Sequence, residues 1–264
     1  MSLAIDRDGR GVLTMRLDRP EKRNAIDDDM MRSLIATFEA AATDDNVRVI
    51  VLEGAGNDFC GGADIIARNR GDSGEKPRVG SIQRRVPVQA HRLLPLVLTV
   101  QVPVVAKVRG WAAGIGFQLA LAADVCIASA DARFWEPFTE RGFTPDSGAT
   151  WLLPRRVGAV RARELLLLGR TLTGTEAASW GAIHQAVPAG QLDAAVEEVV
   201  ARFASGLTVA LGLTKWLLHE GANSPFDAQL EYEAFALELS SRSADFREGM
   251  SAFREKRAPR FDGR

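Results

Sequence analysis

The segment VVAKVRGWAAGIGFQLALAAD, residues 104–124, decides the fold of this chain. Val104–Val108 is an apolar, β-branched run that is typical of a buried strand. Three glycines follow, and the apolar stripe after them predicts a helix that begins near Ile115. Glycines let two backbone segments approach closely, and the first N–H groups of a helix lack partners, so this turn is suited to binding negative charge. It follows neither GxxxxGK[ST] nor GxGxxG, which favours a developing oxyanion over a nucleotide phosphate.

A second turn of the same kind lies upstream. VRVIVLE (47–53) predicts a strand, and it leads into GAGNDFCGGADI (54–65), where two glycines precede an expected helix start at Ala63. Two such turns in one domain can direct the N–H groups of Ala63 and Ile115 at one atom, which is the geometry of an oxyanion hole. The alternative interpretation is that the glycines serve only close packing of strand against helix.

Composition limits the classes of function. The chain has 264 residues with 33 basic and 34 acidic side chains, and this balance favours neither a nucleic acid nor a membrane as partner. The two cysteines, Cys60 and Cys126, lie in apolar contexts that suit a reducing compartment, so we expect a cytoplasmic protein. The sequence holds no HExxH or CxxC spacing, and we expect no bound metal.

Four motifs carry a family resemblance. They are, in chain order, DRPEKRNAI (18–26), DFCGGADI (58–65), VRGWAAGIGFQLALAAD (108–124) and GFTPDSGATWLLPRRVG (142–158). Over about residues 3–190 the chain resembles the enoyl-CoA hydratase/isomerase, or crotonase, superfamily, and the fourth motif is most similar to the ring-1,2-epoxyphenylacetyl-CoA isomerase-like subgroup. The resemblance implies an α/β fold, a spiral of ββα repeats, that acts on an acyl-CoA thioester. It implies no cofactor beyond the coenzyme A of the substrate.

The domain organisation follows from where the strand signals stop. From Gln191 onward only helical patterns occur. We therefore predict an acyl-CoA-binding core over residues 1–195 and a helical oligomerisation domain over residues 196–264. The resemblance implies that this second domain assembles the chain into a homotrimer or a hexamer.

One carboxylate is the leading catalytic candidate. Family hydratases activate a water with two glutamates, and the matching positions here carry Gln118 and Phe138, neither of which can act as a base. Asp146, in TPDSG, occupies the position of the working aspartate in the isomerase-like subgroup. Proton transfer by Asp146 during isomerisation is therefore the favoured mechanism. The alternative role for Asp146 is an N-cap of the following helix.

Three other functions stay open. Glu136 or Glu140 could supply an atypical carboxylate for a hydratase. His91 could be the base, with Asp146 as nucleophile, of an acyl-CoA hydrolase or dehalogenase-like enzyme. The loss of both family glutamates also fits an inactive acyl-CoA-binding homologue.

The resemblance and the motifs also name binding residues. The candidates for contact with coenzyme A are Lys22, Arg23, Ala25, Gly61, Asp64, Ile65 and Lys215. The candidates for the acyl pocket are Trp111, Gln118, Trp135, Phe138 and Phe143.

Overall fold

A six-stranded sheet forms the centre of the protein. The computed structural model describes residues 2–64 and 79–263. The strand order is β1-β2-β3-β4-β6-β9, and only the β1–β2 pair is antiparallel. The strands are β1 (Leu3–Arg7), β2 (Val12–Leu17), β3 (Val49–Gly54), β4 (Val104–Val108), β6 (Val125–Ser129) and β9 (Gln185–Val187). The two strands predicted from the sequence are present as β3 and β4.

Both faces of this sheet are buried, and the alternation along β3 shows how. Ile50 and Leu52 lie in the main apolar cluster, beside the helices α1 (Asp28–Ala41), α4 (Ala90–Thr99) and α5 (Ile115–Ala122). Val49 and Val51 face the other way and pack in a second cluster with α8 (Leu192–Ala204). A parallel strand covered on both faces needs apolar residues at every position, which explains the continuous run VIVL.

Local sequence signals account for several of the helix ends. Asp27 caps α1, since its carboxylate accepts the N–H of Met30 at 2.8 Å. Pro87 lies in the short 3-10 turn that separates α3 (Ser81–Arg85) from α4, whereas Pro95 is accommodated inside α4. Thr173 and Glu176 form a capping box on α7 (Gly174–Ser179).

A smaller sheet lies beside the first and carries the turn that begins α5. It contains β5 (Trp111–Ala113), β7 (Arg133–Trp135) and β8 (Leu172–Thr173) in the order β5-β7-β8. The long helix α6 (Ala149–Leu168) follows the irregular stretch after β7 and is broken at Gly158, where φ is 77°.

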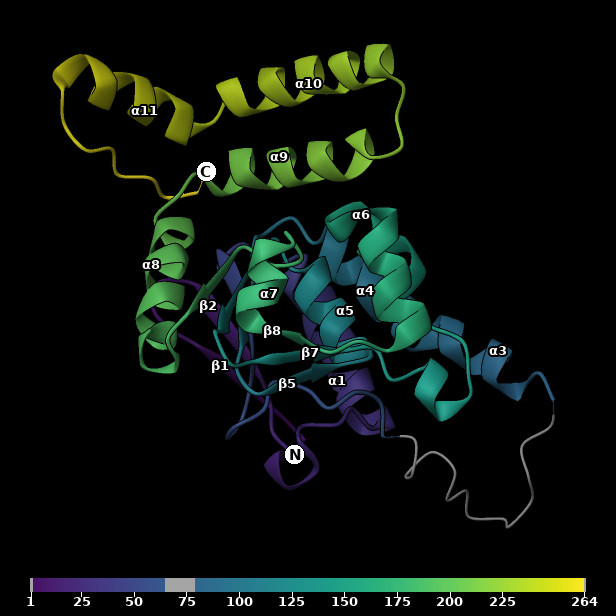
Figure 1. The fold of residues 1–264 in the computed structure, drawn as a ribbon. Coiled ribbons are helices and arrows are strands. Elements are labelled where there is room, and N and C mark those ends of the chain that lie inside the picture. The colour runs from purple at the N-terminus through teal and green to yellow at the C-terminus, as the bar shows by residue number, and fades with distance from the viewer. Residues whose placement is uncertain (1, 65–78, 264) are drawn as a thin grey trace.

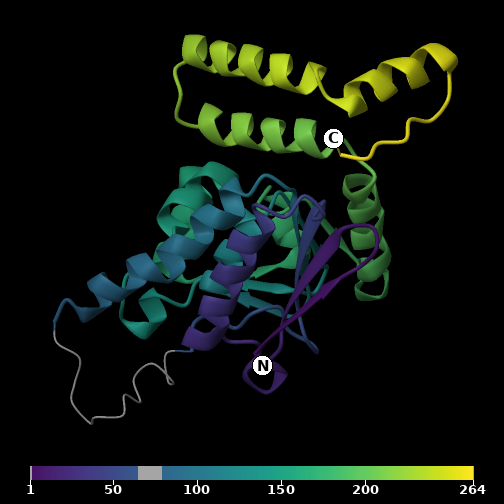
Figure 2. The same cartoon turned by 180° about the vertical axis from the view of Figure 1, so that it is seen from behind.

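Three helices stand apart from this core as a separate layer at one end of the molecule: α9 (Thr208–Gly221), α10 (Phe226–Ser241) and α11 (Ala244–Glu255) (Figures 1 and 2). The predicted boundary at residue 195 falls inside α8, a helix that packs on the sheet, so the outlying layer begins at Thr208. This layer exposes many large apolar side chains, among them Leu218, Phe226, Phe235, Leu237, Leu239 and Phe253.

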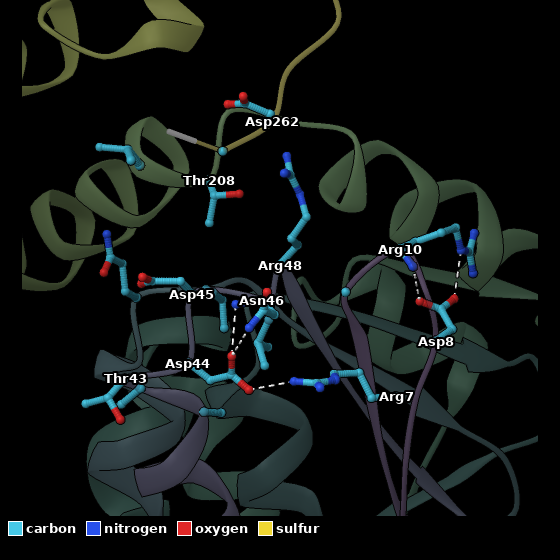
Figure 3. Close-up of a pocket in the computed structure, with 18 of the residues that line it drawn as sticks. Arg7, Asp8, Arg10, Thr43, Asp44, Asp45, Asn46, Arg48, Thr208 and Asp262 are labelled. Atoms are coloured by element: carbon cyan, nitrogen blue, oxygen red, sulfur yellow. Dashed lines mark hydrogen bonds and ion pairs between the residues drawn. The ribbon is translucent and has the colours of Figure 1, made fainter.

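A polar cavity of about 730 Å³ lies where the start of α9 and the C-terminal tail pass over the β1–β2 hairpin (Figure 3). Its lining carries charges of both signs, and Arg48 crosses it to bond the carbonyl of Gly206. None of the predicted site residues lines it. In the part of the chain that the structure describes, no helix is long and apolar enough to cross a membrane.

Candidate active site

The centre of the site is a short backbone segment, residues 60–64, that lies between two others. On one side Gly61 donates to the carbonyl of Arg23 at 2.7 Å, and Asp64 donates to the carbonyl of Ile26 at 2.9 Å. On the other side the N–H of Ala113 donates to the carbonyl of Cys60 at 2.9 Å. The segment therefore runs parallel to β5, with Cys60 opposite Ala112.

This register brings the two predicted oxyanion donors together. Ala63 forms a parallel bridge with Ile26: the carbonyl of Gly62 accepts the N–H of Ile26, and the N–H of Asp64 donates to the carbonyl of Ile26. The N–H of Ala63 itself therefore points away from Ile26, toward β5 and α5. Ile115 is the first residue of α5, where an N–H has no partner within the helix. Among residues 2–64 and 79–263, no acceptor binds either N–H group.

One part of the sequence prediction is corrected here. Ala63 does not begin a helix within the described residues; it lies in a β-bridge, and Asp64 is also non-helical. Within the described part of the chain, the pairing pattern of the bridge, and not a helix terminus, leaves the N–H of Ala63 without an acceptor. Ile65 lies outside the described residues.

Glycines make this close approach of backbone segments possible. A Cβ on Gly116 would lie 2.6 Å from both the Cβ and the carbonyl oxygen of Cys60. A Cβ on Gly62 would lie 3.2 Å from the carbonyl oxygen of Ala113, and Gly62 also has a φ of 103°. The interpretation of the glycines as packing residues and the interpretation as parts of an oxyanion hole are thus compatible.

We expect Gly116→Ala to lower turnover by about tenfold or more, because the new methyl group must push residues 60–63 away from α5 and separate the two donors. Steady-state kinetics measures this loss. Gly9→Ala is the matched control, since a Cβ there meets nothing within 4 Å. Unchanged turnover in Gly116→Ala would contradict the close register of Ala63 and Ile115.

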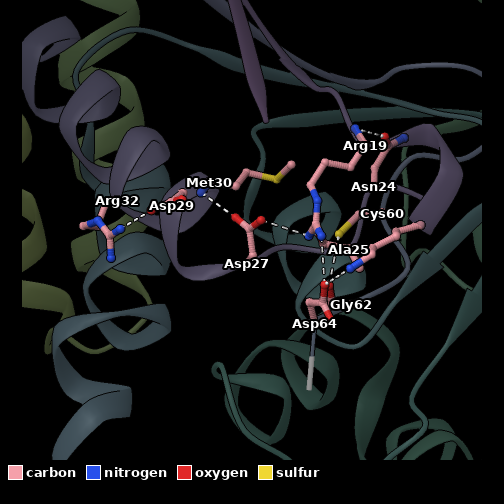
Figure 4. A network of polar contacts seen from close by, with 11 residues as sticks. Arg19, Asn24, Ala25, Asp27, Asp29, Met30, Arg32, Cys60, Gly62 and Asp64 are labelled. Atoms are coloured by element: carbon pink, nitrogen blue, oxygen red, sulfur yellow. Dashed lines mark hydrogen bonds and ion pairs between the residues drawn. The ribbon is translucent and has the colours of Figure 1, made fainter. Parts of the chain in front are cut away.

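Arg19 holds the segment around Ala63 in place. Its guanidinium, only 13% exposed, bonds the carbonyl of Ala25 at 2.6 Å, the carboxylate of Asp64 at 2.9 Å and that of Asp27 at 3.2 Å (Figure 4). Lys22 also reaches Asp64, at 3.1 Å. Because Asp64 and Asp27 flank the bridge between Ile26 and Ala63, Arg19 fixes the direction of the Ala63 N–H.

Asn24 adds a second brace that the sequence did not reveal. It is fully buried, its amide donates to the carbonyls of Ala55 and Asp58, and its oxygen accepts the N–H of Arg19. The predicted coenzyme A residues Lys22, Arg23, Ala25, Gly61 and Asp64 are therefore gathered around one frame. Arg23 is exposed there, and the Cζ of its guanidinium lies over the ring of Trp111, 5.8 Å from the ring centroid.

Asp146 is exposed at the end of the loop that precedes α6. The N-cap of α6 is Gly148, with no side-chain cap, so Asp146 does not cap the helix through its carboxylate. Its Oδ1 instead accepts the hydroxyl of Ser147 at 2.8 Å, and Ser147 is buried with a φ of 53°. The N-cap alternative is therefore wrong, and the carboxylate is held by one neighbouring hydroxyl.

Gln118 and Glu136 contact each other in the protein interior. Both are fully buried, and the Nε2 of Gln118 donates to the Oε1 of Glu136 at 2.5 Å. Burial raises the pKa of Glu136 well above its ordinary 4.5, and the negative charge of Asp146 raises it further. Gln118 lies one turn after Ile115 on α5, so the contact with Glu136 is close to the start of that helix.

The other catalytic candidates lie apart. Glu140 is exposed on the 3-10 turn Thr139–Arg141, beside Gly169. His91 is on the exposed side of α4, and among the described residues it has no hydrogen bond or ion pair to Asp146.

Lys215 requires a correction. It was predicted to meet a coenzyme A phosphate, but it is buried and forms an ion pair with Asp124 at 2.7 Å. The carbonyls of Val97 and Val102 also accept from its ammonium group. Burial lowers the pKa of this lysine, and Asp124 opposes the shift. Lys215 therefore ties α9 to the core.

The aromatic candidates form two pairs. Trp111 and Trp135 meet edge to face with ring centroids 5.9 Å apart, and Phe138 and Phe143 do so at 5.6 Å. Phe138 is buried in the main cluster, whereas Phe143 is exposed. Trp135 is fixed by a bond from its indole N–H to the carbonyl of Gly169.

Comparison with known proteins places this site in a family. The family model described as enoyl-CoA hydratase/isomerase matches residues 7–264. The chain is 39% identical to the 1,2-epoxyphenylacetyl-CoA isomerase of Escherichia coli (97% of this chain, 96% of that protein) and 32% identical to the 2,3-dehydroadipyl-CoA hydratase of the same organism (99% of each). The crystal structure of an enoyl-CoA hydratase from Bacillus anthracis superposes with a TM-score of 0.92 at 29% identity over the whole of both chains. The chain belongs to the enoyl-CoA hydratase/isomerase family.

Proposed function

We propose that this enzyme is an isomerase of acyl-CoA thioesters. The thioester carbonyl lies between the N–H groups of Ala63 and Ile115, which stabilise the enolate oxygen as it forms. The carboxylate of Asp146 takes a proton from the α or γ carbon and returns it at another carbon, so that a double bond moves or an activated ring opens. Atoms balance without a cofactor, because the proton that leaves one carbon re-enters at another.

The observation that carries this proposal is the pair of N–H groups that meet no acceptor among the described residues, brought into register by the bridges at Cys60 and Ala63. The accessible carboxylate of Asp146, which caps no helix, supplies the base. The identity with a 1,2-epoxyphenylacetyl-CoA isomerase supports isomerisation, and Gln118 and Phe138 at the positions of the two hydratase glutamates count against hydration. The free, buried thiols of Cys60 and Cys126 are consistent with a cytoplasmic enzyme.

Three assays on the wild-type enzyme test this function. We expect conversion of a 3-enoyl-CoA to its 2-enoyl isomer, with little hydration of 2-enoyl-CoA and no release of free thiol. Hydration faster than isomerisation would favour a hydratase, and thiol release would favour a hydrolase. Binding of acyl-CoA with no turnover of any probe would favour an inactive homologue.

We also propose that the enzyme is a homotrimer or a dimer of trimers. The layer of α9–α11 leaves large apolar side chains in water, among them Phe235 at 70% and Phe253 at 80% exposure. Apolar area of this extent is typical of a protein–protein interface.

Light scattering at micromolar concentration should report a multiple of three chains. Phe235→Asp should shift the distribution toward smaller species, since it puts a charge on the exposed apolar face, whereas Phe235→Leu should keep the assembly. A monomer in the wild-type sample would refute the proposed assembly.

A further inference from the structure

Two buried acceptors in the site meet no hydrogen-bond partner in the part of the chain that the structure describes. The contact between Gln118 and Glu136 uses one amide hydrogen and one carboxylate oxygen, at 2.5 Å. The remaining oxygens, Oε1 of Gln118 and Oε2 of Glu136, are fully enclosed, and among the described residues nothing bonds to them. Leaving a buried polar atom unpaired costs free energy. Gln118 and Glu136 contact each other and each leave one such atom unpaired, which requires an explanation.

A single proton accounts for both oxygens. If Glu136 is protonated, its hydroxyl can donate to the carbonyl oxygen of Gln118 while the amide of Gln118 donates to the other carboxyl oxygen. In this arrangement the carbonyl oxygen of Gln118 and both carboxyl oxygens of Glu136 take part in a hydrogen bond. An ionised Glu136 could not do this, because a carboxylate only accepts.

The charges around Glu136 favour the same state. Complete burial penalises an ionised carboxylate, and no cation among the described residues compensates for it. Within residues 2–64 and 79–263, the charged side chain that acts on Glu136 is Asp146, and its charge is also negative. Two carboxylates close together do not readily share one site in ionised form.

We propose that Glu136 is a positioning residue that carries a proton while Asp146 is ionised, and that its neutral carboxyl forms a two-bond pair with the amide of Gln118. Gln118 lies on α5, which begins with the oxyanion donor Ile115, and Glu136 directly follows β7 on the way to the Asp146 loop. The pair therefore links the donor and the base, and it keeps a single negative charge in the site. This inference rests on the proposed role of Asp146.

Infrared difference spectroscopy tests the protonation state directly. The C=O band of a protonated carboxyl should be present in the wild-type enzyme at neutral pH and absent from Glu136→Gln. Glu198→Gln, which removes an exposed carboxylate on α8, is the control and should keep the band. Absence of such a band from the wild-type spectrum would overturn the proposal.

Stability as a function of pH gives a second readout. An acid whose pKa is raised by folding stabilises the folded state fully only below the pKa of the unfolded chain, and this contribution is lost as pH rises toward the folded value. As pH rises above about 4.5, the wild type should therefore lose stability relative to Glu136→Gln. Its folding equilibrium constant should fall by up to about tenfold per pH unit relative to that of the variant. A pH-independent difference between the two, at one protein concentration, would contradict a neutral Glu136.

Turnover separates positioning from proton transfer. Glu136→Leu breaks the pair, and we expect it to lower kcat by about tenfold. Glu136→Gln keeps two bonds to Gln118 and should restore most of that loss. If Glu136→Gln were instead as inactive as Asp146→Asn, Glu136 would be moving substrate protons and the proposal would fail. If Asp146→Asn kept its activity while the infrared band remained, the role of Asp146 would fail and the protonated pair would stand.

Discussion

Asp146→Asn is expected to lower isomerisation by at least about a hundredfold, the usual scale for a lost general base. Asparagine has the same shape and can still accept the hydroxyl of Ser147, but it cannot take a proton from carbon. Acyl-CoA binding should survive, because the two N–H donors and the frame around Asp64 are untouched. Steady-state kinetics with an enoyl-CoA and calorimetric titration with a non-reactive acyl-CoA measure the two quantities separately.

The control for this substitution is His91→Ala. His91 is exposed on α4, so its loss should change turnover little. If His91→Ala were the inactive variant and Asp146→Asn turned over substrate at near the wild-type rate, the base would have to be sought on α4. Loss of acyl-CoA binding in Asp146→Asn would show that the carboxylate serves binding and not proton transfer.

Lys215→Met should destabilise the protein by at least about 2 kcal/mol. Removing one partner of a fully buried ion pair costs roughly 3–5 kcal/mol, because the other charge stays buried without compensation. The cost here is at the low end, since the side chain of Asp124 is 27% exposed and still accepts the N–H of Val104. Denaturant unfolding at a fixed protein concentration measures the loss.

A double-mutant cycle isolates this pair from other effects of the lysine. Asp124→Asn alone leaves the ammonium of Lys215 with two carbonyls, and the double variant leaves no buried charge. We expect the double variant to be more stable than the sum of the single losses implies. Arg242→Met, which breaks an exposed pair with Glu238 on α10, should cost less than about 1 kcal/mol. Strict additivity in the cycle would show that Lys215 and Asp124 do not interact.

Short-range signals in the sequence predicted much of the fold. The buried strands β3 and β4 and the start of α5 at Ile115 depend on residues within a few positions of one another. Hydrophobic periodicity and capping act over the same short range, so one sequence suffices to find them. The ordered motifs extended this to the family, which comparison confirmed.

Long-range pairing accounts for what the sequence did not reveal. The contacts of Arg19 with Asp64, and of Gln118 with Glu136, join residues 45 and 18 positions apart, and no local pattern indicates either. Lys215 was misplaced for the same reason, because its partner Asp124 lies 91 positions away.

By itself the sequence determined the strand–glycine–helix element that leads into α5, and it predicted the two backbone donors and the carboxylate of Asp146, since each depends on residue type and near neighbours. Only the tertiary structure decided that Ala63 presents its N–H from a bridge, that Asp146 caps no helix and that Glu136 is buried against Gln118. The physical reason is that burial and the direction of a backbone N–H are set by which segments pack together. That packing is a property of the whole fold, and no short stretch of residues contains it.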